Sequence, residues 1–562
     1  MGDTVAAATA RALAAAGIDR VFGLPGGEVL VLIDELRRVG VDFVLMRHEA
    51  NAGIAAAVYG KLRRQPGVVL TTLGPGAANL MLPLGNAYLD QEPLVAISAQ
   101  IPDDFPASHT HQLLPLHDVY RPVTRLVEKI TSRNAGDAVA RAIAACMTRP
   151  FGTAYLTLSA REALKPIDEE PPPGGAASAG PIRSRIRSRI GSWIGSRIGS
   201  ASADRPSDAP RGDARRHADD LTARLATSQR PMVLIGLGID PANAGRIRRW
   251  IDAWQLPVAV TPKVKGVVDE TAATFVGVVS GMAADGLMCD ALAASDALVG
   301  FGLDPVEVDK TWHAELPIHW VLEAPNVGGR VPEGVELVNH VRLLDALSPS
   351  PPAVWNQPFR EFQQKRRDML LRPATPAGNG STMWPGDIVN ALARALPAET
   401  IVTTDVGSHK YVFGQFWPSR HPETFWMSNG LSGMSYGLSA AIGAKLARPD
   451  APVLAALGDG GFSMNAQELE TAERVGARFV TVVLEDDSYS LIKLSQEGKK
   501  LAAYRTDFGP IDTVKMAEAC GVEGLRTANP DELSAAARRA VDRRQSLVIA
   551  VPVDYRDYRR LF

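Results

Sequence analysis

The stretch APVLAALGDGGF, residues 451–462, decides the fold of this chain. Its apolar residues 453–457 predict a buried strand, and the glycine-rich turn 458–461 follows at once. In an open parallel sheet, ligands bind beyond the carboxyl ends of the strands. Glycines let backbone amides approach a phosphate closely, and a helix that begins beside them favours an anion. We expect that helix to begin near Asn465, with Asn465 and Glu468 forming a capping pair.

The next predicted strand, residues 478–486, ends in an acidic run. This run is EDDSY, residues 485–489. Because parallel strands deliver their carboxyl ends to the same sheet edge, Asp459 and Asp486 are expected to lie close together. Carboxylate oxygens beside a phosphate-sized anion are typical of Mg²⁺, which bridges protein carboxylates and ligand phosphates. The alternative is that residues 458–461 form a tight turn without a ligand. The acidic run at the end of the next strand disfavours that alternative.

Strand and helix patterns alternate through the rest of the chain. Strands that are apolar on both faces and separated by helices indicate parallel sheets covered by helices. We therefore predict an α/β fold of three doubly wound parallel-sheet domains. The other predicted strands are 42–47, 67–74, 93–100, 231–239, 297–303, 318–324, 400–407 and 546–553, and the predicted helices include 51–64 and 76–89.

One segment departs from the composition of the rest, residues 166–215. It is rich in Pro, Gly, Ser and Arg, and isoleucine recurs at every fourth position from Ile182 to Ile198. Gly and Ser are poor helix formers, so we expect a flexible linker. An Arg/Ser-rich tag for nucleic acid or a partner is the alternative. The predicted domains are 1–165, 216–350 and 380–562.

Overall composition excludes several classes of protein. Lys and Arg number 60 against 62 Asp and Glu, which argues against a nucleic-acid binder that relies on a broad basic surface. The three cysteines lie far apart without a CxxC pair, which argues against a disulfide scaffold or a structural zinc site. No run of 18 apolar residues is present, and the N-terminus lacks the pattern of a signal peptide. We expect a cytoplasmic protein without a membrane span.

The motifs above resemble those of thiamine-diphosphate (ThDP) enzymes. GDG at 458–460, followed by 24 residues and then the acidic strand end, is similar to the diphosphate half of that fingerprint. The N-terminal region is similar to the other half, with GLPGG at 23–27, RHEANA at 47–52 and TTLGPGAAN at 71–79. The resemblance implies a pyrimidine-binding domain, a central domain and a diphosphate-binding domain, in that order.

The resemblance also implies catalytic roles. Glu49 would share a proton with the aminopyrimidine ring, so that the cofactor itself takes the proton from thiazolium C2. Gln112 would lie near the thiazolium and orient the substrate. In SNGLSGM, residues 428–434, Met434 would stand between the two rings and the Ser432 carbonyl would accept from the amino group. The implied substrate pocket is Gly27, Gln112, Leu491 and Ile492.

The implied metal ligands are Asp459, Asp486 and the backbone carbonyl of Ser488. The family usually has Asn-Asn where this chain has Glu485-Asp486, so Asp486 adds a negative charge beside the diphosphate. The implied cofactor-binding residues are Pro25, Gly26, Glu49, Asn79, Val406, Gly407, Ser408, His409, Ser432, Gly433, Met434, Gly458, Asp459, Gly460, Gly461, Asp486, Ser488, Tyr489, Ser490 and Leu491.

Within this superfamily the chain most resembles catabolic-type acetolactate synthases that need no FAD. The resemblance is carried by HQ at 111–112, DPVE at 304–307, FGP at 508–510 and VPVDYRD at 551–557. Such enzymes decarboxylate pyruvate to an enamine on ThDP, which attacks a second pyruvate to give 2-acetolactate and CO₂. The resemblance implies a homodimer or homotetramer with active sites at the subunit interface, where Glu49 comes from the partner.

Three alternatives stay open. Residues 113–115 are Leu-Leu-Pro where related enzymes usually have polar side chains, so the enzyme would be a ThDP decarboxylase, carboligase or lyase with a different acceptor. GLGIDP at 236–241 begins like a dinucleotide fingerprint but lacks its third glycine, which argues against NAD and leaves FAD as an alternative. A degenerate, non-catalytic ThDP fold is disfavoured by the retention of Glu49, Asp459 and Asp486.

Overall fold

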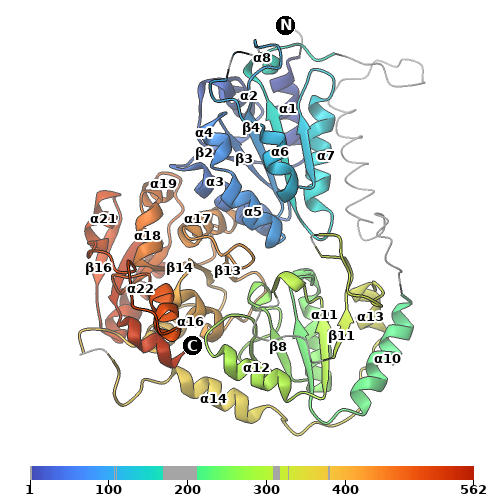
Figure 1. The fold of residues 1–562 in the computed structure, drawn as a ribbon, viewed down its shortest axis with the longest axis vertical. Helices are drawn as coiled ribbons and strands as arrows, with labels where there is room; N and C mark the ends of the chain where they lie inside the picture. The colour runs from blue at the N-terminus through green and yellow to red at the C-terminus, as the bar shows by residue number, and fades with distance from the viewer. Residues whose placement is uncertain are drawn as a thin grey trace. The chain divides into compact units, whose positions relative to one another are not determined.

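The computed structural model describes residues 3–106, 108, 110–168, 212–307, 317–326, 328–377 and 380–562 (Figure 1). Most of the predicted linker, residues 169–211, lies outside the described residues. The isoleucine repeat, for which a tag was the alternative prediction, lies there too. The chain divides into two compact units, Met1–Pro206 and Ser207–Phe562. We describe each unit by itself.

Unit 1 contains one six-stranded parallel sheet in the order β2-β1-β3-β4-β6-β5. Its strands are β1 (Arg20–Gly23), β2 (Asp42–Leu45), β3 (Gly67–Thr71), β4 (Leu94–Ala99), β5 (Leu126–Lys129) and β6 (Thr153–Leu158). Its helices are α1 (Val5–Ala15), α2 (Leu30–Arg38), α3 (Glu49–Leu62), α4 (Pro75–Ala78), α5 (Met81–Leu89), α6 (Leu116–Tyr120), α7 (Ala135–Met147) and α8 (Ala160–Ala163), with 3₁₀ turns at Gly27–Val29 and Arg121–Val123.

Small residues let α3 lie deep inside unit 1. All of its residues except Lys61 are buried. A Cβ on Gly53 would come within 2.5 Å of Pro83 in α5, and one on Gly60 within 2.0 Å of the Gly67 nitrogen at the start of β3. These close approaches fix the start of α3, where Glu49 lies, against the sheet. The single helix predicted over 76–89 is wrong, because the chain breaks between α4 and α5.

Unit 2 contains two parallel sheets. The central sheet has the order β11-β10-β7-β8-β9 and the C-terminal sheet β13-β12-β14-β15-β17-β16. The central elements are α10 (Ala214–Ala226), β7 (Pro231–Ile235), a 3₁₀ turn (Pro241–Asn243), α11 (Ala244–Trp254), β8 (Val258–Val260), a 3₁₀ turn (Pro262–Val264), β9 (Phe275–Val278), α12 (Asp285–Ala293), β10 (Ala297–Phe301), a 3₁₀ turn (Pro305–Glu307), β11 (Ile318–Val321), α13 (His340–Ala346) and α14 (Arg360–Leu370).

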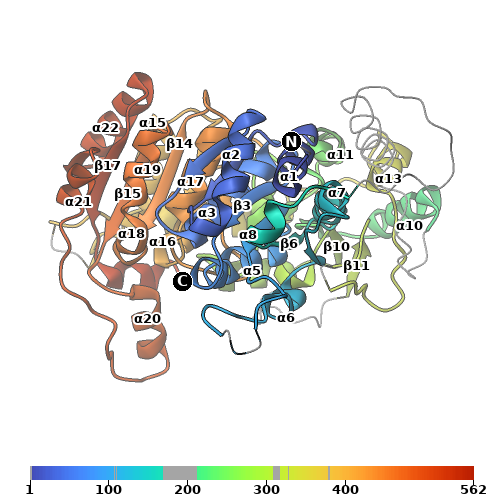
Figure 2. The same cartoon turned by 90° about the horizontal axis from the view of Figure 1, so that it is seen from above.

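The C-terminal sheet has helices on both faces (Figure 2). Its elements are α15 (Pro385–Ala395), β12 (Ile401–Thr404), α16 (Ser408–Phe416), β13 (Phe425–Met427), α17 (Tyr436–Ala447), β14 (Val453–Gly458), α18 (Asp459–Asn465), α19 (Glu468–Arg474), β15 (Val480–Glu485), α20 (Ser490–Gly498), α21 (Thr513–Ala519), β16 (Glu523–Arg526), α22 (Pro530–Arg543), β17 (Leu547–Pro552) and a 3₁₀ turn (Tyr555–Arg560).

The first and third sheets have the same strand order. In each, the second strand of the chain lies on one side of the first strand and the third strand on the other, which creates a topological switch point. Ligands of doubly wound sheets bind at the carboxyl ends of the strands at such a point. The prediction of an α/β fold with doubly wound parallel sheets is therefore confirmed.

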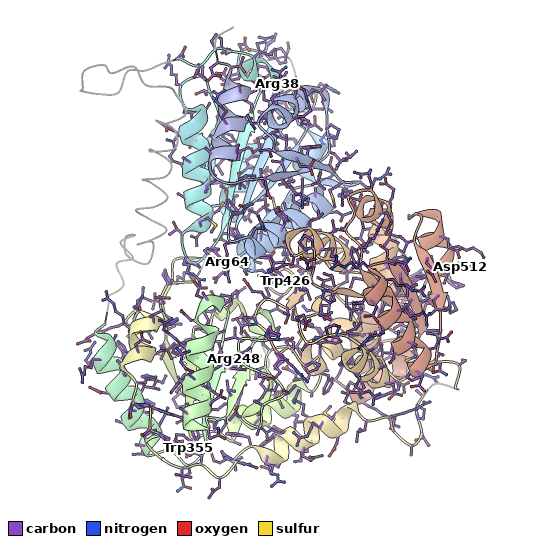
Figure 3. The ribbon with its side chains drawn as sticks, turned by 180° about the vertical axis from the view of Figure 1, so that it is seen from behind. Arg38, Arg64, Arg248, Trp355, Trp426 and Asp512 are labelled. Atoms are coloured by element: carbon purple, nitrogen blue, oxygen red, sulfur yellow. The ribbon has the colours of Figure 1, made fainter. Side chains whose placement is uncertain are left out.

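One hydrophobic core runs through both sheets of unit 2. It joins side chains of the central sheet, such as Val260, to side chains of the C-terminal sheet, such as Val402. Arg248 of α11, labelled in Figure 3, donates to the carbonyls of Gly266, Val267 and Arg420 and so ties α11 to the loop before β13. Among the described residues, no helix is both long and apolar enough to cross a membrane.

Candidate active site

Three neighbouring strands of the C-terminal sheet end at one place. Thr404 at the end of β12 pairs with Ala456 of β14, and Gly458 at the end of β14 pairs with Leu484 of β15. The next residues along the chain therefore meet at the switch point between β12 and β14. Asp405 follows β12, and Asp459 follows β14.

Asp459 begins α18, with Gly458 as its N-cap. Its Oδ1 accepts from the Gly460 amide (2.8 Å), and its Oδ2 accepts from the amides of Asp486 (3.0 Å) and Asp487 (2.7 Å). One carboxylate thus fixes the glycine turn to the end of the neighbouring strand. The amides at the start of α18 form the kind of helix terminus that binds an anion.

The expected helix start at Asn465 is wrong. Asn465 is the last residue of α18, and its Nδ2 donates to the Ser435 carbonyl (2.8 Å) and to Ser439 Oγ (3.3 Å). Glu468 begins α19, whose N-cap residue is Gln467 and makes no side-chain capping bond. The glycines of the turn are therefore the first turn of the helix, and the anion site lies closer to the strand than the capping pattern indicated.

The three acidic residues of the run after β15 differ in their surroundings. Glu485 forms a two-point ion pair with Arg526, with oxygen–nitrogen distances of 3.0 and 2.6 Å. Asp487 is exposed. Asp486 instead turns into the site, where its Oδ1 accepts from the amide (3.1 Å) and hydroxyl (2.9 Å) of Ser488.

Burial makes the Asp459–Asp486 pair costly without a cation. Burial, followed by the charge of Asp486, raises the pKa of Asp459 to about 7, and burial raises the pKa of Asp486 to about 6. Neither carboxylate has an ion-pair partner within the part of the chain that the structure describes. Two carboxylates and a backbone carbonyl are the oxygen ligands that Mg²⁺ takes beside a ligand phosphate, so the residues present fit that ion.

A pocket opens at this switch point. The carboxyl ends of β12, β14 and β15 and the start of α20 form its walls, and Met434 closes one side. The lining residues are Val406, Gly407, Ser408, His409, Met434, Gly458, Asp459, Gly460, Gly461, Leu484, Asp486, Ser488, Tyr489, Ser490, Leu491, Ile492 and Tyr558. The structure thus brings together the cofactor-binding residues predicted in unit 2, apart from Ser432 and Gly433, and adds Leu484 and Tyr558.

The polar side chains of the pocket are held in place by buried contacts. His409 is 4% exposed, burial lowers its pKa to about 3, and its Nε2 has no hydrogen-bond partner in the described part of the chain. The neutral ring donates one hydrogen bond to the Asp405 backbone, so Nε2 is an acceptor, which fits a bound water or another donor. The hydroxyls of Ser408 and Ser490 lie 2.8 Å apart, and Ser490 also hydrogen-bonds Asp486.

Asp405 lies behind the pocket, one residue before Val406, the first of the implied cofactor-binding residues at this strand end. It is fully buried and accepts from the amides of Val406 (2.7 Å), Ser435 (3.0 Å) and Tyr436 (3.3 Å). A Cβ on Gly461 would come within 2.3 Å of its Oδ2, so only glycine lets α18 pass this close. Burial raises the pKa of Asp405 to about 6.

Residues 428–435 form an irregular loop beside the pocket. Ser432 (φ +55°) and Ser435 (φ +68°) adopt the left-handed conformation, which bends the loop twice. The Gly433 amide donates to Ser428 Oγ (2.9 Å), and the buried Lys410 donates to the Ser428 carbonyl (2.8 Å). Ser432 is exposed, and both it and Gly433 lie outside the pocket lining.

In unit 1, Glu49 lies at the start of α3 and is 9% exposed. Its Oε2 accepts from Asn79 Nδ2 (2.8 Å). A Cβ on Gly76 would lie 3.3 Å from the other oxygen, Oε1. The break between α4 and α5, which the predicted single helix missed, is what places the Asn79 side chain on this carboxylate. One carboxylate oxygen is therefore held by Asn79, and the other accepts no hydrogen bond from the residues that the structure describes.

The other predicted residues of unit 1 gather around the same loop, residues 72–76. A Cβ on Gly26 would come within 2.4 Å of the Thr72 side chain, and one on Gly74 within 2.9 Å of Gln112 Cβ. Gln112 is exposed and has φ +57°. Pro25 and Gly27 are exposed in the turn after β1, with open space above Gly27. The predicted residues of unit 1 thus surround the switch point between β1 and β3.

Comparison with known protein families agrees with this geometry. Residues 3–118 match the N-terminal TPP-binding domain of thiamine pyrophosphate enzymes, residues 218–347 their central domain, and residues 405–551 their C-terminal TPP-binding domain. Together the three matches cover more than half of the chain. The first and last of them contain the two switch points described above.

Curated proteins are similar over nearly the full length. Acetolactate synthase of Bacillus subtilis (strain 168) is 29% identical over 96% of this chain and 91% of its own length. The catabolic acetolactate synthase of Raoultella terrigena is 28% identical (97% and 94%), and the isozyme 2 large subunit of Escherichia coli (strain K12) is also 28% identical (93% and 91%). With all three domain models matched in order and the pocket at the switch point, this chain belongs to the thiamine pyrophosphate enzyme family.

Proposed function

We propose that this protein is a ThDP- and Mg²⁺-dependent carboligase of the acetolactate synthase type. Two molecules of pyruvate and one proton give one 2-acetolactate and one CO₂. The observation that carries the proposal is the pocket in which Asp459, Asp486 and the first turn of α18 converge. The similarity to acetolactate synthases along the whole chain supports the choice of reaction.

Bound ThDP supplies a carbanion-stabilising thiazolium, and the protein supplies its binding and orientation. In this proposal Asp459, Asp486 and the Ser488 carbonyl hold Mg²⁺ against the diphosphate. The Gly461 amide in the first turn of α18 would donate to a phosphate oxygen, since the Gly460 amide already donates to Asp459. His409 lines the same pocket.

Glu49 carries the acid–base role in this proposal. Asn79 fixes one of its oxygens, which leaves the other to hold a proton shared with the pyrimidine ring. Gln112 orients the substrate, and Leu491 and Ile492 limit its size. We further propose a homodimer or homotetramer in which the Glu49 of each active site comes from the partner subunit, as the family resemblance implies.

We propose that the central domain works without FAD or NAD. The turn after β7, residues 236–238, is where a dinucleotide phosphate would need free amides. Gly236 N donates to the Phe301 carbonyl (3.0 Å), Leu237 N to Glu307 Oε2 (2.6 Å) and Gly238 N to the Gly302 carbonyl (2.7 Å). The buried carboxyl group of Glu307 therefore occupies the position that a phosphate would take.

A carboligase with an acceptor other than pyruvate is the second candidate. Leu113 and Leu114, directly after Gln112, are 48% and 38% exposed, and Ile492 is 56% exposed. These exposed apolar side chains favour a less polar acceptor than pyruvate.

The deciding experiment supplies the purified protein with ThDP, Mg²⁺ and pyruvate and identifies the product by NMR. We expect 2-acetolactate. Acetaldehyde as the sole product would contradict the carboligase proposal. A parallel reaction with pyruvate and equimolar 2-ketobutyrate or an aldehyde identifies the preferred acceptor. Preference for the aldehyde would favour the second candidate.

A further inference from the structure

The C-terminal segment, defined as residues 554–562, contributes one side chain to the cofactor pocket. Tyr558 lines this pocket together with Asp459 and Asp486, and it is 1% exposed. It belongs to a 3₁₀ turn, Tyr555–Arg560, that begins just after the last strand of the sheet. The segment that ends the chain is thus one wall of the site.

Two sets of contacts hold the C-terminal segment on α20, the helix that carries Leu491 and Ile492. The Tyr555 hydroxyl donates to Glu497 Oε1 (3.2 Å), and Arg559 forms an ion pair with the same carboxylate. The ammonium of Lys493 lies 4.1 Å from the centre of the Tyr555 ring. The segment and α20 are therefore joined through Lys493 and Glu497, one helical turn apart.

Other contacts hold the segment on the rest of unit 2. The buried Asp557 accepts from the Ala377 amide (2.7 Å), and the Leu561 carbonyl accepts from the Ala284 amide (2.6 Å). The Phe562 ring stacks on Tyr558, with centroids 5.8 Å apart and planes 13° from parallel. Tyr558 is therefore held from both ends of the segment.

The phenol of Tyr558 is a hydrogen-bond donor in an anionic pocket. Burial, together with the charges of Asp486 and Asp459, raises its pKa, so the hydroxyl keeps its proton at neutral pH. Hydrogen bonds to charged acceptors contribute more than those between neutral groups. A plain packing role would need the ring but not the hydroxyl.

We propose that Tyr558 is a cofactor-binding residue, whose hydroxyl would donate to the diphosphate that Asp459, Asp486 and α18 would hold with Mg²⁺. Docking of the C-terminal segment and binding of ThDP–Mg²⁺ then stabilise each other. This inference rests on the proposed function, because it takes ThDP as the ligand.

The test compares Y558F with Y555F in the full-length protein. Both substitutions remove one phenol hydroxyl from the same segment, but only Tyr558 lines the pocket. Calorimetric titration with ThDP in excess Mg²⁺ should show affinity about ten- to hundredfold weaker for Y558F and within about twofold of wild type for Y555F. Inorganic diphosphate with Mg²⁺ should show the same difference, since the lost contact is to the diphosphate.

Hydrogen–deuterium exchange provides a readout that packing alone would not move. Adding ThDP–Mg²⁺ should slow exchange in residues 554–562 of the wild type, and less so in Y558F, while the two proteins exchange alike without cofactor. If Y558F is poorly folded, F562A serves instead, because it removes the stacking partner and leaves the hydroxyl. F562A should bind ThDP several-fold more weakly.

Wild-type affinity in Y558F, with unchanged exchange of the segment on cofactor binding, would overturn the inference while leaving the proposed function intact. A wild-type protein that binds no ThDP would overturn both. The two failures are therefore distinguishable in one set of titrations.

Discussion

Glu49 is the residue on which turnover should depend most. Its replacement by glutamine keeps the size and one hydrogen bond of the side chain but removes the titrating proton. We expect E49Q to lower kcat by about 10²- to 10⁴-fold, the usual contribution of a positioned acid–base group. ThDP affinity measured by titration should change little. Glu35, a surface partner of Arg38, is the matched control, and E35Q should keep full activity. Activity of E49Q near that of E35Q would contradict the role given to Glu49.

Asp486 and Asp487, in the acidic run after β15, allow a matched comparison in which each substitution removes one carboxylate. D486A removes a carboxylate that faces the pocket, whereas D487A removes one that is exposed and outside the lining. Alanine is used because asparagine, the usual residue of the family at position 486, keeps an oxygen ligand. Both substitutions change the net charge equally, so only a ligand role separates them. We expect Mn²⁺ binding with ThDP, followed by electron paramagnetic resonance, to weaken at least about tenfold in D486A and little in D487A. Equal effects would mean that Asp486 acts through its charge and not as a ligand.

Local patterns predicted that Asp459 and Asp486 lie close together, the family resemblance implied most other residues of the C-terminal pocket, and neither pointed to residues that arrive from elsewhere in the chain. Asp459 and Asp486 each follow an apolar strand directly, so the sheet itself brings them together. Tyr558 comes from a turn after the last strand, and no spacing in the sequence connects residue 558 to residue 459. Leu484 was missed because a leucine at a strand end has no signal that separates a pocket wall from core.

At the scale of elements, the patterns found most strands of the three sheets but missed β6 (Thr153–Leu158), although all of its residues are buried, and several short strands. β8 (Val258–Val260) and β13 (Phe425–Met427) have three residues each, too few for a periodicity to stand out. The helix over 76–89 was predicted as one because its apolar residues continue through the break after Asn79. At Asn465, a capping pattern outweighed the glycines, although a helix beginning at the strand end satisfies more of the turn's backbone groups.

The turn after β7 should make stability depend on pH through Glu307. Burial raises the pKa of this carboxyl from 4.5 to about 8. The folded state therefore holds the proton more tightly than the unfolded state. The stability that this group contributes is complete below about pH 4.5 and is lost as the pH rises through about 8.

Glutamine resembles the protonated form of Glu307, so E307Q should have a flatter profile. We expect the wild-type unfolding temperature to fall more steeply than that of E307Q between about pH 5 and 8. E333Q, at an exposed glutamate of the same domain, is the control and should follow the wild type. Parallel curves for wild type and E307Q would show that this carboxyl does not titrate in that range.

At the scale of the whole molecule, the proposed sharing of active sites between subunits can be tested by mixing two inactive variants. E49Q and D459N each lack one half of the site. If Glu49 is supplied by the partner, a mixed dimer has one site with both defects and one site with neither. Co-expression in equal amounts should therefore restore about a quarter of wild-type activity in a statistical mixture of dimers. No restoration would mean that both halves come from the same chain.

The predicted linker permits a second test at this scale. The linker was predicted from composition alone, and residues 169–211 lie outside the described residues. We expect deletion of residues 176–210 to leave kcat and the unfolding temperature close to the wild-type values. A large loss of activity, with ThDP affinity retained, would assign the segment a role beyond connection. A scrambled segment of the same length and composition is the control for linker length.

The core that runs through both sheets of unit 2 has a consequence for recombination between related genes. Side chains of the central and C-terminal sheets belong to one cluster, while unit 1 has a core of its own. A crossover between the two units leaves each core with a single parent. A crossover between the central and C-terminal sheets takes the side chains of one core from two parents. The volumes of those side chains were never selected to pack together. Hybrid genes of this family should therefore survive with an exchanged N-terminal unit far more often than with an exchanged central domain.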